Sequence, residues 1–110
     1  MAKIKSLRTP LALTLVAPIF SGTSAATLFE GDCLDLLRSM PDASTQLVVT
    51  SPPYNLGKAY EKRGALEKYL AWQGSVIDEC VRVLSPTGSI CWQVGNYVNA
   101  GEIVPLDIAL

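Results

Sequence analysis

Residues 66 to 84 carry the clearest periodic pattern of the chain. Apolar side chains recur there at steps of three and four, which is the spacing of one face of an α-helix. Ser85 and Pro86 follow, and a proline disfavours helical backbone in the residue before it, so the pattern predicts a helix that ends near Leu84. With Gln73 as its one polar member, the face consists of Leu66, Tyr69, Leu70, Gln73, Val76, Ile77, Cys80, Val81 and Leu84.

Two apolar runs, one on each side of this helix, predict strands. The run 45–50 is rich in β-branched residues and has almost no polar alternation. Such a run is typical of a strand that is buried on both faces. The run 89–94 follows a turn at Thr87-Gly88 and predicts the next strand.

The ends of the sequence add shorter elements. Residues 27–44 predict a short strand, a turn at Gly31 and a short helix, with Asp32 at the N-cap position. Residues 101–110 predict the beginning of a further helix, in which Pro105 is tolerated only near the first turn.

The predicted order is therefore strand, helix, strand, long helix, strand, helix. Alternation of this kind predicts an α/β fold with a mainly parallel sheet, right-handed crossovers and helices on both faces. No internal repeat or linker interrupts residues 27–110, so we assign them to one domain. The last helix reaches Leu110 without a cap, and we expect the domain to be truncated at that point.

Composition narrows the kinds of site that the chain can build. Its 110 residues are 49% apolar and 17% charged, which suits a packed globular core. There is no histidine, and the three cysteines form no Cys-x-x-Cys pair. We therefore expect no metal site, and a histidine-based triad is excluded. Widely spaced cysteines fit reduced, partly buried thiols in a cytoplasmic protein.

The charge pattern gives little support for nucleic-acid binding by charge alone. The net charge is −1, and one basic cluster stands out after residue 57, interrupted by two glutamates. The pattern favours a solvated loop and helix start over a rim that contacts phosphates. The cluster consists of Lys58, Lys62, Arg63 and Lys68.

Residues 1–26 form a leader-like or poorly specified segment. Basic residues precede the apolar run 11–20, and small residues fill 21–26, as in a secretory signal. The run is too short to span a bilayer. The alternative is a first strand that packs on the domain. The rest of the sequence favours a cytoplasmic protein with no membrane partner.

Two prolines follow the 45–50 strand directly, in the sequence Ser51-Pro52-Pro53-Tyr54. Ligands of open α/β sheets bind beyond the carboxyl ends of the strands, where this motif begins. Proline fixes φ and has no N–H, so the two proline carbonyls are acceptors without a competing donor. A hydroxyl and a flat ring flank them. The motif predicts a small rigid pocket for an amino group on a flat ring.

This motif resembles the catalytic motif of amino-methylating DNA methyltransferases, in which Asp, Asn or Ser precedes Pro-Pro and an aromatic residue. The stretch 49–54 is close to the form associated with N4-cytosine enzymes. The flanking sequences EGDCLDLLRSMPDASTQLVVTSPPYN and DECVRVLSPTGSICWQVGN are similar to the family in order as well as in kind. The resemblance covers residues 27–108 and implies a Rossmann-like methyltransferase fold, present in part.

The resemblance also implies roles for the motif residues. The side chain of Ser51 and the carbonyl of Pro52 would accept hydrogen bonds from the exocyclic amine of cytosine. Pro53 would complete the rigid turn, and Tyr54 would stack on a target base flipped out of double-stranded DNA. Nitrogen N4 would then attack a methyl group by positioning and electrostatic assistance, without a nucleophilic cysteine.

The implied methyl donor is S-adenosyl-L-methionine, and the resemblance places Gly31 and Asp32 near it. The alternative for Asp32 is a helix cap alone. The family's Phe-x-Gly-x-Gly loop and its target-recognition segment do not occur in the sequence. We therefore expect the chain to be an N-terminal fragment. The sequence leaves open whether this fragment is active by itself. A restriction endonuclease is a possible partner of such an enzyme.

Several other interpretations stay open. The same amine chemistry serves N6-adenine methylation of DNA. Methylation of RNA bases or of protein glutamine usually has Asn-Pro-Pro-Tyr, so Ser51 argues against it. An inactive relic would use the motif as a simple turn, because serine and proline are common turn residues. Residues 1–26 alone motivate a secreted binding module.

Three neighbouring features complete the sequence-based predictions. Asn55 is expected to turn the chain rather than to act in the site. Trp72 and Trp92 are expected in the core, because Trp92 lies within an apolar strand. The Gly95-Asn96 pair follows the carboxyl end of a predicted strand and is expected to border the same cleft.

Overall fold

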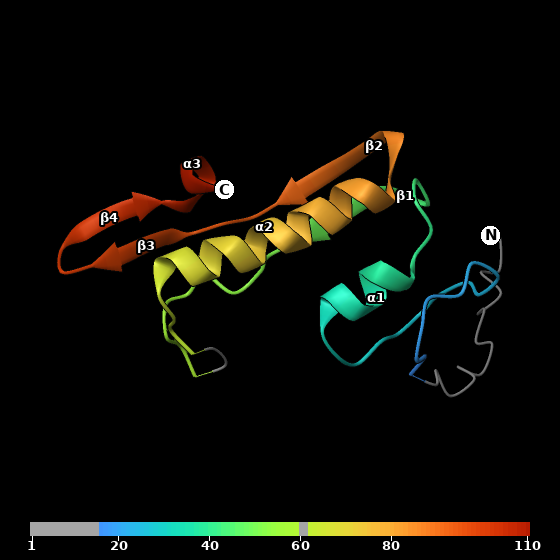
Figure 1. Ribbon diagram of the computed structural model, residues 1–110, viewed down its shortest axis with the longest axis horizontal. Helices are drawn as coiled ribbons and strands as arrows, with labels where there is room; N and C mark the ends of the chain where they lie inside the picture. The colour runs from blue at the N-terminus through green and yellow to red at the C-terminus, as the bar shows by residue number, and fades with distance from the viewer. Residues whose placement is uncertain (1–15, 60–61) are drawn as a thin grey trace, which may run out of the picture.

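The computed structural model describes residues 16–59 and 62–110, in which helices and strands alternate up to β2 and a hairpin follows (Figure 1). The elements are α1 (Cys33–Ser39), β1 (Thr45–Thr50), α2 (Leu66–Val83), β2 (Leu84–Trp92), β3 (Asn96–Asn99), β4 (Glu102–Pro105) and α3 (Leu106–Ala109).

Strands β1 and β2 pair in parallel, and α2 is the crossover that joins them. In the register of the pair, Val48 lies opposite Ile90 and Thr50 lies opposite Trp92. An irregularity between Thr45 and Leu47 shifts the register once. The predicted α/β class with a parallel pair is therefore confirmed, on a small scale.

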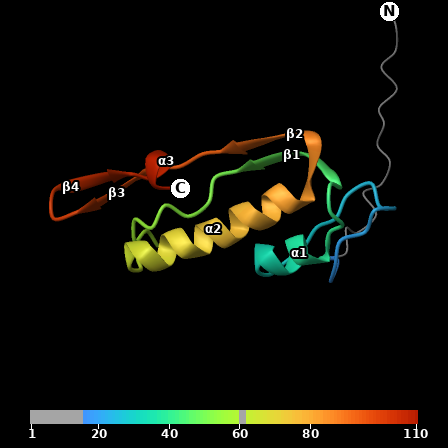
Figure 2. The ribbon, with the colours of Figure 1, turned by 45° about the horizontal axis from the view of Figure 1, so that its top comes forward.

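Helices α1 and α2 pack on the same face of this sheet (Figure 2). The buried cluster joins Leu34 of α1 to Val76 and Cys80 of α2, and partly buried side chains of both strands pack against it. The prediction of helices on both faces is wrong for the described residues. The partly buried strand side chains are Val48, Ile90 and Trp92.

The opposite face of the sheet is exposed. Leu47 is 55% exposed and Val49 is 70% exposed, so the prediction that β1 is buried on both faces is wrong. Successive side chains of a strand point to opposite faces, and the described residues place no element against this one. The apolar run therefore shows that these side chains could be buried, but it does not show whether another element packs against them.

Three further predicted elements differ in the structure. Residues 27–30 form no strand. Strand β2 begins directly after α2 at Leu84, where a turn was expected at Thr87-Gly88. Residues 102–105 form β4 rather than a helix.

The β3–β4 hairpin explains the last of these differences. Its strands are antiparallel, and Ala100 and Gly101 between them have φ of 50° and 84°. Two consecutive positive φ values are typical of the tight turn that matches the twist of a hairpin. Alanine is not a usual residue in that turn, so the sequence signal was weak. Pro105 ends β4 and stands at the N-cap of α3.

The stripe of α2 is largely as predicted. Tyr69, Gln73, Val76 and Cys80 are buried. Val81 is 58% exposed, and Val83 is buried in its place. No helix in the described part of the chain is long and apolar enough to cross a membrane.

Arg82 fastens the end of α1 to the end of α2. Its guanidinium donates to the carbonyls of Leu37 (2.7 Å) and Met40 (3.0 Å), which are among the last carbonyls of α1. The side chain also pairs with Glu79 and Asp42. Because the last carbonyls of a helix have no partner within it, a guanidinium placed there caps the helix.

The leader-like interpretation of residues 1–26 concerns mostly residues 1–15, which lie outside the described residues. Residues 16–26 have no regular structure, although the backbone N–H of Phe20 donates to Ser39 of α1. The interpretation stays a prediction.

Candidate active site

The Ser51-Pro52-Pro53-Tyr54 motif begins where β1 ends, next to the end of β2. The backbone N–H of Gln93 donates to the carbonyl of Thr50 at 3.0 Å, which continues the parallel ladder by one residue. The Ser51 hydroxyl donates to Oε1 of Gln93 at 3.1 Å. The residues directly after the two strands therefore supply both Ser51 and a side chain that orients its hydroxyl.

A hydroxyl from α2 holds the second proline. The Tyr69 hydroxyl donates to the carbonyl of Pro53 at 2.7 Å, and Tyr69 lies on the buried stripe of the helix. Because Pro53 has a fixed φ, a bond to its carbonyl restricts the one backbone dihedral that proline leaves free. The motif is thus attached to the helix as well as to the strand.

The ring of Tyr54 lies against Gly95. A Cβ at position 95 would lie 3.2 Å from Cδ2 of Tyr54, closer than ordinary van der Waals contact. Glycine therefore lets the backbone after β2 approach the ring closely. Gly95 thus contacts the Tyr54 end of the motif, but neither Gly95 nor Asn96 is among the residues that line the cavity beside the motif, so the predicted border of the cleft stays a prediction.

Asn55 does more than turn the chain. It has φ of 60°, in the left-handed region where asparagine is favoured, and its side chain is buried. The amide donates to the carbonyl of Gly64 at 2.9 Å and accepts from the N–H of Gly64 at 2.7 Å. This reciprocal pair joins the two ends of the loop 56–63. The sequence analysis predicted the turn and missed the pair.

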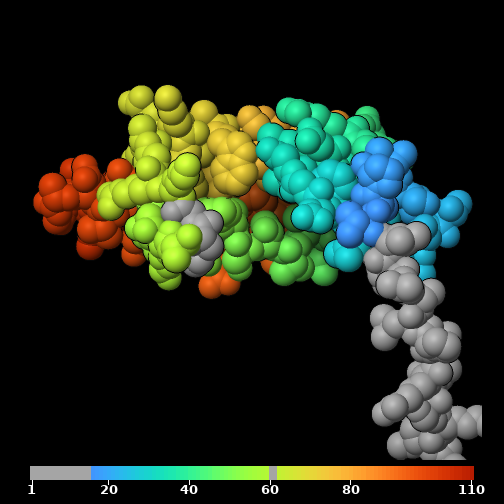
Figure 3. Space-filling model, turned by 90° about the horizontal axis from the view of Figure 1, so that it is seen from below, coloured from blue at the N-terminus to red at the C-terminus, as the bar shows by residue number. Residues whose placement is uncertain are grey.

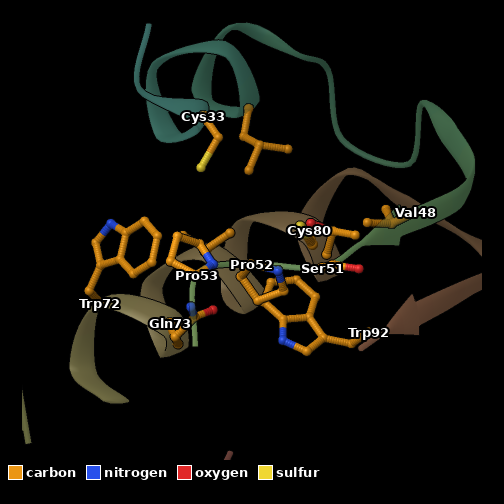
Figure 4. Close-up of a pocket in the computed structure, with 12 residues that line it drawn as sticks. Cys33, Val48, Ser51, Pro52, Pro53, Trp72, Gln73, Cys80 and Trp92 are labelled. Atoms are coloured by element: carbon orange, nitrogen blue, oxygen red, sulfur yellow. The ribbon is translucent and has the colours of Figure 1, made fainter. Parts of the chain in front are cut away.

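A cavity of about 330 Å³ opens between the motif and the two helices (Figure 4). Figure 4 shows Pro52 and Pro53 between the rings of Trp72 and Trp92, with Gln73 beside the prolines. Trp92 packs on the core as predicted, whereas Trp72 is 37% exposed at the cavity and is not a core residue. Ser51, Thr50, Val48, Cys33, Leu37, Val76 and Cys80 complete the lining.

The surface around the motif is open to ligands. In Figure 3, the green atoms of β1 and the segment after it lie at the surface between the cyan α1 and the yellow-green loop that leads into α2. Ser51 borders two further hollows. One lies along the motif itself, with Pro52, Pro53 and Tyr54. A flat ring can therefore approach the serine from outside.

Gly31 and Asp32 lie at the N-terminus of α1. The Asp32 carboxylate accepts from the N–H of Leu34 at 2.9 Å, which confirms the predicted N-cap. A Cβ at Gly31 would lie 2.9 Å from a ring carbon of Phe29, so the close approach of Phe29 requires glycine there. The next residue, Cys33, lines the cavity, whereas Gly31 and Asp32 are not among its lining residues, and their cofactor role stays a prediction.

Two thiols on the cavity wall remain protonated at neutral pH. Burial raises the pKa of the Cys33 thiol, and the adjacent Asp32 carboxylate raises it further. Burial also raises the pKa of the Cys80 thiol, with a smaller contribution from Cys33. Because the thiolate is the reactive form, neither group is activated as a nucleophile.

Arg63 of the basic cluster is engaged by the hairpin. Its guanidinium donates to the carbonyl of Val98 and lies over the ring of Tyr97, 4.7 Å from the ring centroid. Lys58, Lys62 and Lys68 are exposed. The exposed lysines therefore agree with the predicted solvated loop, whereas Arg63 binds the loop to the hairpin.

The structure contains a parallel βαβ unit, and the polar and aromatic motif lies at the carboxyl ends of its strands. This is the end at which α/β proteins bind their ligands. The sequence profile of the DNA methylase family, which covers N6 and N4 enzymes, matches residues 45–107. The chain belongs to this family, as its motif predicted.

The chain is also similar to curated proteins that are named as methyltransferases. The chain is 54% identical over 82 residues to the type II methyltransferase M.BglII of Bacillus subtilis, covering 74% of this chain and 23% of that protein. It is 42% identical over 91 residues to M.ScaI of Streptomyces caespitosus, covering 80% and 30%. It is 37% identical over 78 residues to the DNA adenine methyltransferase YhdJ of Escherichia coli, covering 66% and 26%. The chain thus spans less than a third of each of these relatives.

Sequence reasoning found the four consecutive residues of the motif but missed the residues that surround them. Tyr69, Gln73 and Gln93 reach the site from α2 and from the end of β2. A polar residue within an otherwise apolar helical stripe was the available signal for Gln73.

Proposed function

We propose that this chain carries the base-binding part of an S-adenosylmethionine-dependent DNA methyltransferase that methylates the exocyclic N4 amine of cytosine. The observation that supports it most directly is the hydrogen bond from Ser51, which lines the cavity, to Gln93 at the end of β2. We further propose that the enzyme acts in the cytoplasm on double-stranded DNA, with a restriction endonuclease of matching specificity as partner.

The bond to Gln93 prepares Ser51 to accept. A hydroxyl has one hydrogen to donate and two lone pairs to accept. Since Ser51 donates its hydrogen to Gln93, both lone pairs are left for a substrate amine. Acceptance by Ser51 Oγ and by the Pro52 carbonyl favours a more tetrahedral nitrogen, whose lone pair is less delocalised into the ring and can attack a methyl group.

Tyr54 would hold the target ring in place. Its own ring is fixed against Gly95, so it offers a face for stacking without first losing freedom of rotation. A base must leave the duplex to reach such a site. The rigid Pro52-Pro53 turn then fixes the distance between this face and Ser51.

The residues at the N-terminus of α1 fit the methyl donor. S-adenosylmethionine supplies an activated methyl group together with hydroxyl and amino groups on its adenosyl part. Asp32 offers a carboxylate one residue before Cys33, which lines the cavity, and a carboxylate suits those donors. Gly31 leaves the adjacent backbone without a side chain. These two residues would hold the adenosyl part.

N6-adenine methylation is the second candidate. It is favoured by the similarity to the Escherichia coli protein whose name specifies adenine. Adenine presents the same flat amine, so Ser51 and Pro52 would act on it in the same manner. A segment that is inactive without further sequence is the remaining alternative.

Methyl transfer from labelled S-adenosylmethionine to DNA, followed by nucleoside analysis, tests the proposal. Two proteins are assayed: the full chain, and a chimera in which the 82 aligned residues replace their counterpart in the Bacillus subtilis relative. We expect the chimera to form N4-methylcytosine and its Ser51→Ala variant to lose most of this activity.

The other outcomes are equally informative. N6-methyladenine as the product would establish the second candidate. Full activity of the Ser51→Ala chimera would show that the hydroxyl does not act on the amine. An active chimera beside an inactive chain would show that this segment needs the remainder of such an enzyme.

A further inference from the structure

Gln73 is a buried polar residue whose amide has no partner. It is completely buried on the stripe of α2, yet neither Nε2 nor Oε1 has a hydrogen-bond partner among the described residues. The indole Nε1 of Trp92 is likewise buried and unpartnered within the described part of the chain. Both residues line the same cavity of about 330 Å³, which Ser51 also borders.

An arrangement of this kind is unfavourable for folding alone. Buried polar groups in proteins almost always have a hydrogen-bond partner, because an unsatisfied one loses its bonds to water without replacement. The neighbouring positions of the stripe, Tyr69, Val76 and Cys80, are mostly apolar. Leucine has a similar volume and would fill position 73 without this cost. The amide therefore has a use that an apolar side chain does not serve.

The cavity is shaped for a flat ring with polar edges. Its walls are mainly apolar, and Figure 4 shows Pro52, Pro53 and the two tryptophan rings around it. The unpartnered groups include two N–H donors, one on Gln73 and one on Trp92. A suitable ligand presents two acceptors on one edge, next to the group that meets Ser51. Tyr54 does not line this cavity but borders the adjoining hollow, which shares Ser51, Pro52 and Pro53 with it, so a ring at these three residues would reach both.

We propose that Gln73 and Trp92 select cytosine by donating hydrogen bonds to ring nitrogen N3 and carbonyl O2 of the flipped base. This inference rests on the proposed function and names the residues that choose the base. The N4 amine of cytosine is directed to Ser51 and Pro52, which leaves N3 and O2 as the two acceptors. Adenine offers N1 but has a C–H where cytosine has O2, so the Trp92 donor would stay unpaired. The cavity leaves room for a water on Oε1 of Gln73.

Nuclear magnetic resonance of the ¹⁵N-labelled full chain tests the assignment without methyl transfer. 2′-Deoxycytidine and 2′-deoxyadenosine are titrated separately. We expect the side-chain amide signal of Gln73 and the indole signal of Trp92 to shift in a saturable manner with deoxycytidine. Deoxyadenosine should bind at least tenfold more weakly. Absence of saturable shifts, or equal affinity for the two nucleosides, would overturn the inference.

A pair of glutamine variants separates recognition from a structural role. Gln73→Leu should weaken deoxycytidine binding at least tenfold and raise the thermal unfolding midpoint of the free protein by several degrees, because it removes an unsatisfied buried group. The matched control is Gln46→Leu on an exposed position of β1, which should change neither quantity. Unchanged binding with a lower midpoint for Gln73→Leu would show that the amide is structural and would contradict the inference.

The two proposals can fail separately. Selective deoxycytidine binding that depends on Gln73, in a protein whose chimera keeps full activity after Ser51→Ala, would support the base site and reject the catalytic role of the serine. Loss of activity in Ser51→Ala, with equal binding of both nucleosides, would do the reverse. Persistent contacts of the Gln73 amide with water throughout the titration would show that only a buried water occupies the site.

Discussion

At the residue scale, the Ser51 hydroxyl depends on a partner 42 positions away along the chain. Gln93 follows the last residue of β2, and the parallel pairing of β2 with β1 carries it to the motif. A serine in this place differs from an aspartate, which has acceptors only. In the proposed site the hydroxyl would act as an acceptor toward the substrate, because the side chain of Gln93 takes its hydrogen.

The Gln93 bond leads to a prediction about rate. In the chimera, Gln93→Leu should slow methyl transfer about tenfold, because the hydroxyl hydrogen then competes for the space of the substrate amine and a bond of about 1 kcal/mol is lost. Gln93→Glu keeps an acceptor and should restore most of the rate. Single-turnover kinetics at saturating DNA measure both variants. Equal rates for the leucine and glutamate variants would show that Gln93 does not position Ser51.

The residues of the site differ in how far the sequence reveals them. Ser51 to Tyr54 are adjacent in the sequence, so a common site for these four residues could be predicted without a structure. Gln93 and Tyr69 were not predicted, because only tertiary contact brings them to the motif. The cofactor role of Asp32 stays a prediction, although its capping role is confirmed.

At the element scale, α2 connects the two strands and forms one wall of the cavity. Its periodic pattern predicted the helix and most of its buried face correctly. The hairpin was missed because its turn places Ala100 at positive φ, and an alanine in the sequence does not indicate that conformation. The predicted strand at 27–30 is absent because no neighbouring strand pairs with that segment in the described residues.

A matched pair of valines on α2 tests the packing of its buried face. Val76 lies in the buried cluster, whereas Val81 is mostly exposed on the same helix. Val76→Ala should lower the free energy of unfolding by about 2 kcal/mol, through lost burial and a small cavity. Val81→Ala should change it by less than about 0.5 kcal/mol. Chemical denaturation followed by circular dichroism measures both, and similar losses would contradict this orientation of α2.

The thiols that α1 and α2 contribute to their contact predict a dependence on pH. The pKa values of Cys33 and Cys80 are raised in the folded protein, first by burial. The folded state therefore holds these protons more tightly than the unfolded state does. Stability from this source is complete below the pKa of an unfolded thiol, about 8.5, and is lost as the pH rises through the higher folded values.

Denaturant titrations from pH 7 to pH 10 measure this effect. The free energy of unfolding should fall across the alkaline part of the range. In Cys80→Val, which has no ionisable group at this position, the fall should be smaller. An identical alkaline slope in the variant and the parent would show that Cys80 does not contribute.

At the scale of the whole molecule, the described chain has a small core and one uncovered sheet face. Only a few apolar side chains are buried among the described residues, while Leu47 and Val49 stand exposed beside Cys91 of the neighbouring strand. The relatives from Bacillus subtilis, Streptomyces caespitosus and Escherichia coli are each more than three times as long as the matched segment. Sequence patterns gave the apolar character of β1 but not the one-sided placement of its helices, which is a property of the assembled layers.

The uncovered face predicts low solubility of the isolated chain. Replacement of Leu47 and Val49 by lysine should raise the concentration at which the protein stays monomeric, because exposed apolar patches promote association. The thermal unfolding midpoint should change little, since neither side chain packs on the helices. Sedimentation velocity and thermal melts test these expectations. A strongly lowered midpoint would show that this face is packed.

The reciprocal bonds between Asn55 and Gly64 have a consequence for changes of loop length. They close the segment 56–63 at its base, so that its length is decoupled from the position of Ser51. Closing a flexible loop costs only about 0.6 kcal/mol more for each doubling of its length. Insertions and deletions in this segment should therefore leave the geometry of the neighbouring Pro52-Pro53 turn and the position of Ser51 nearly unchanged.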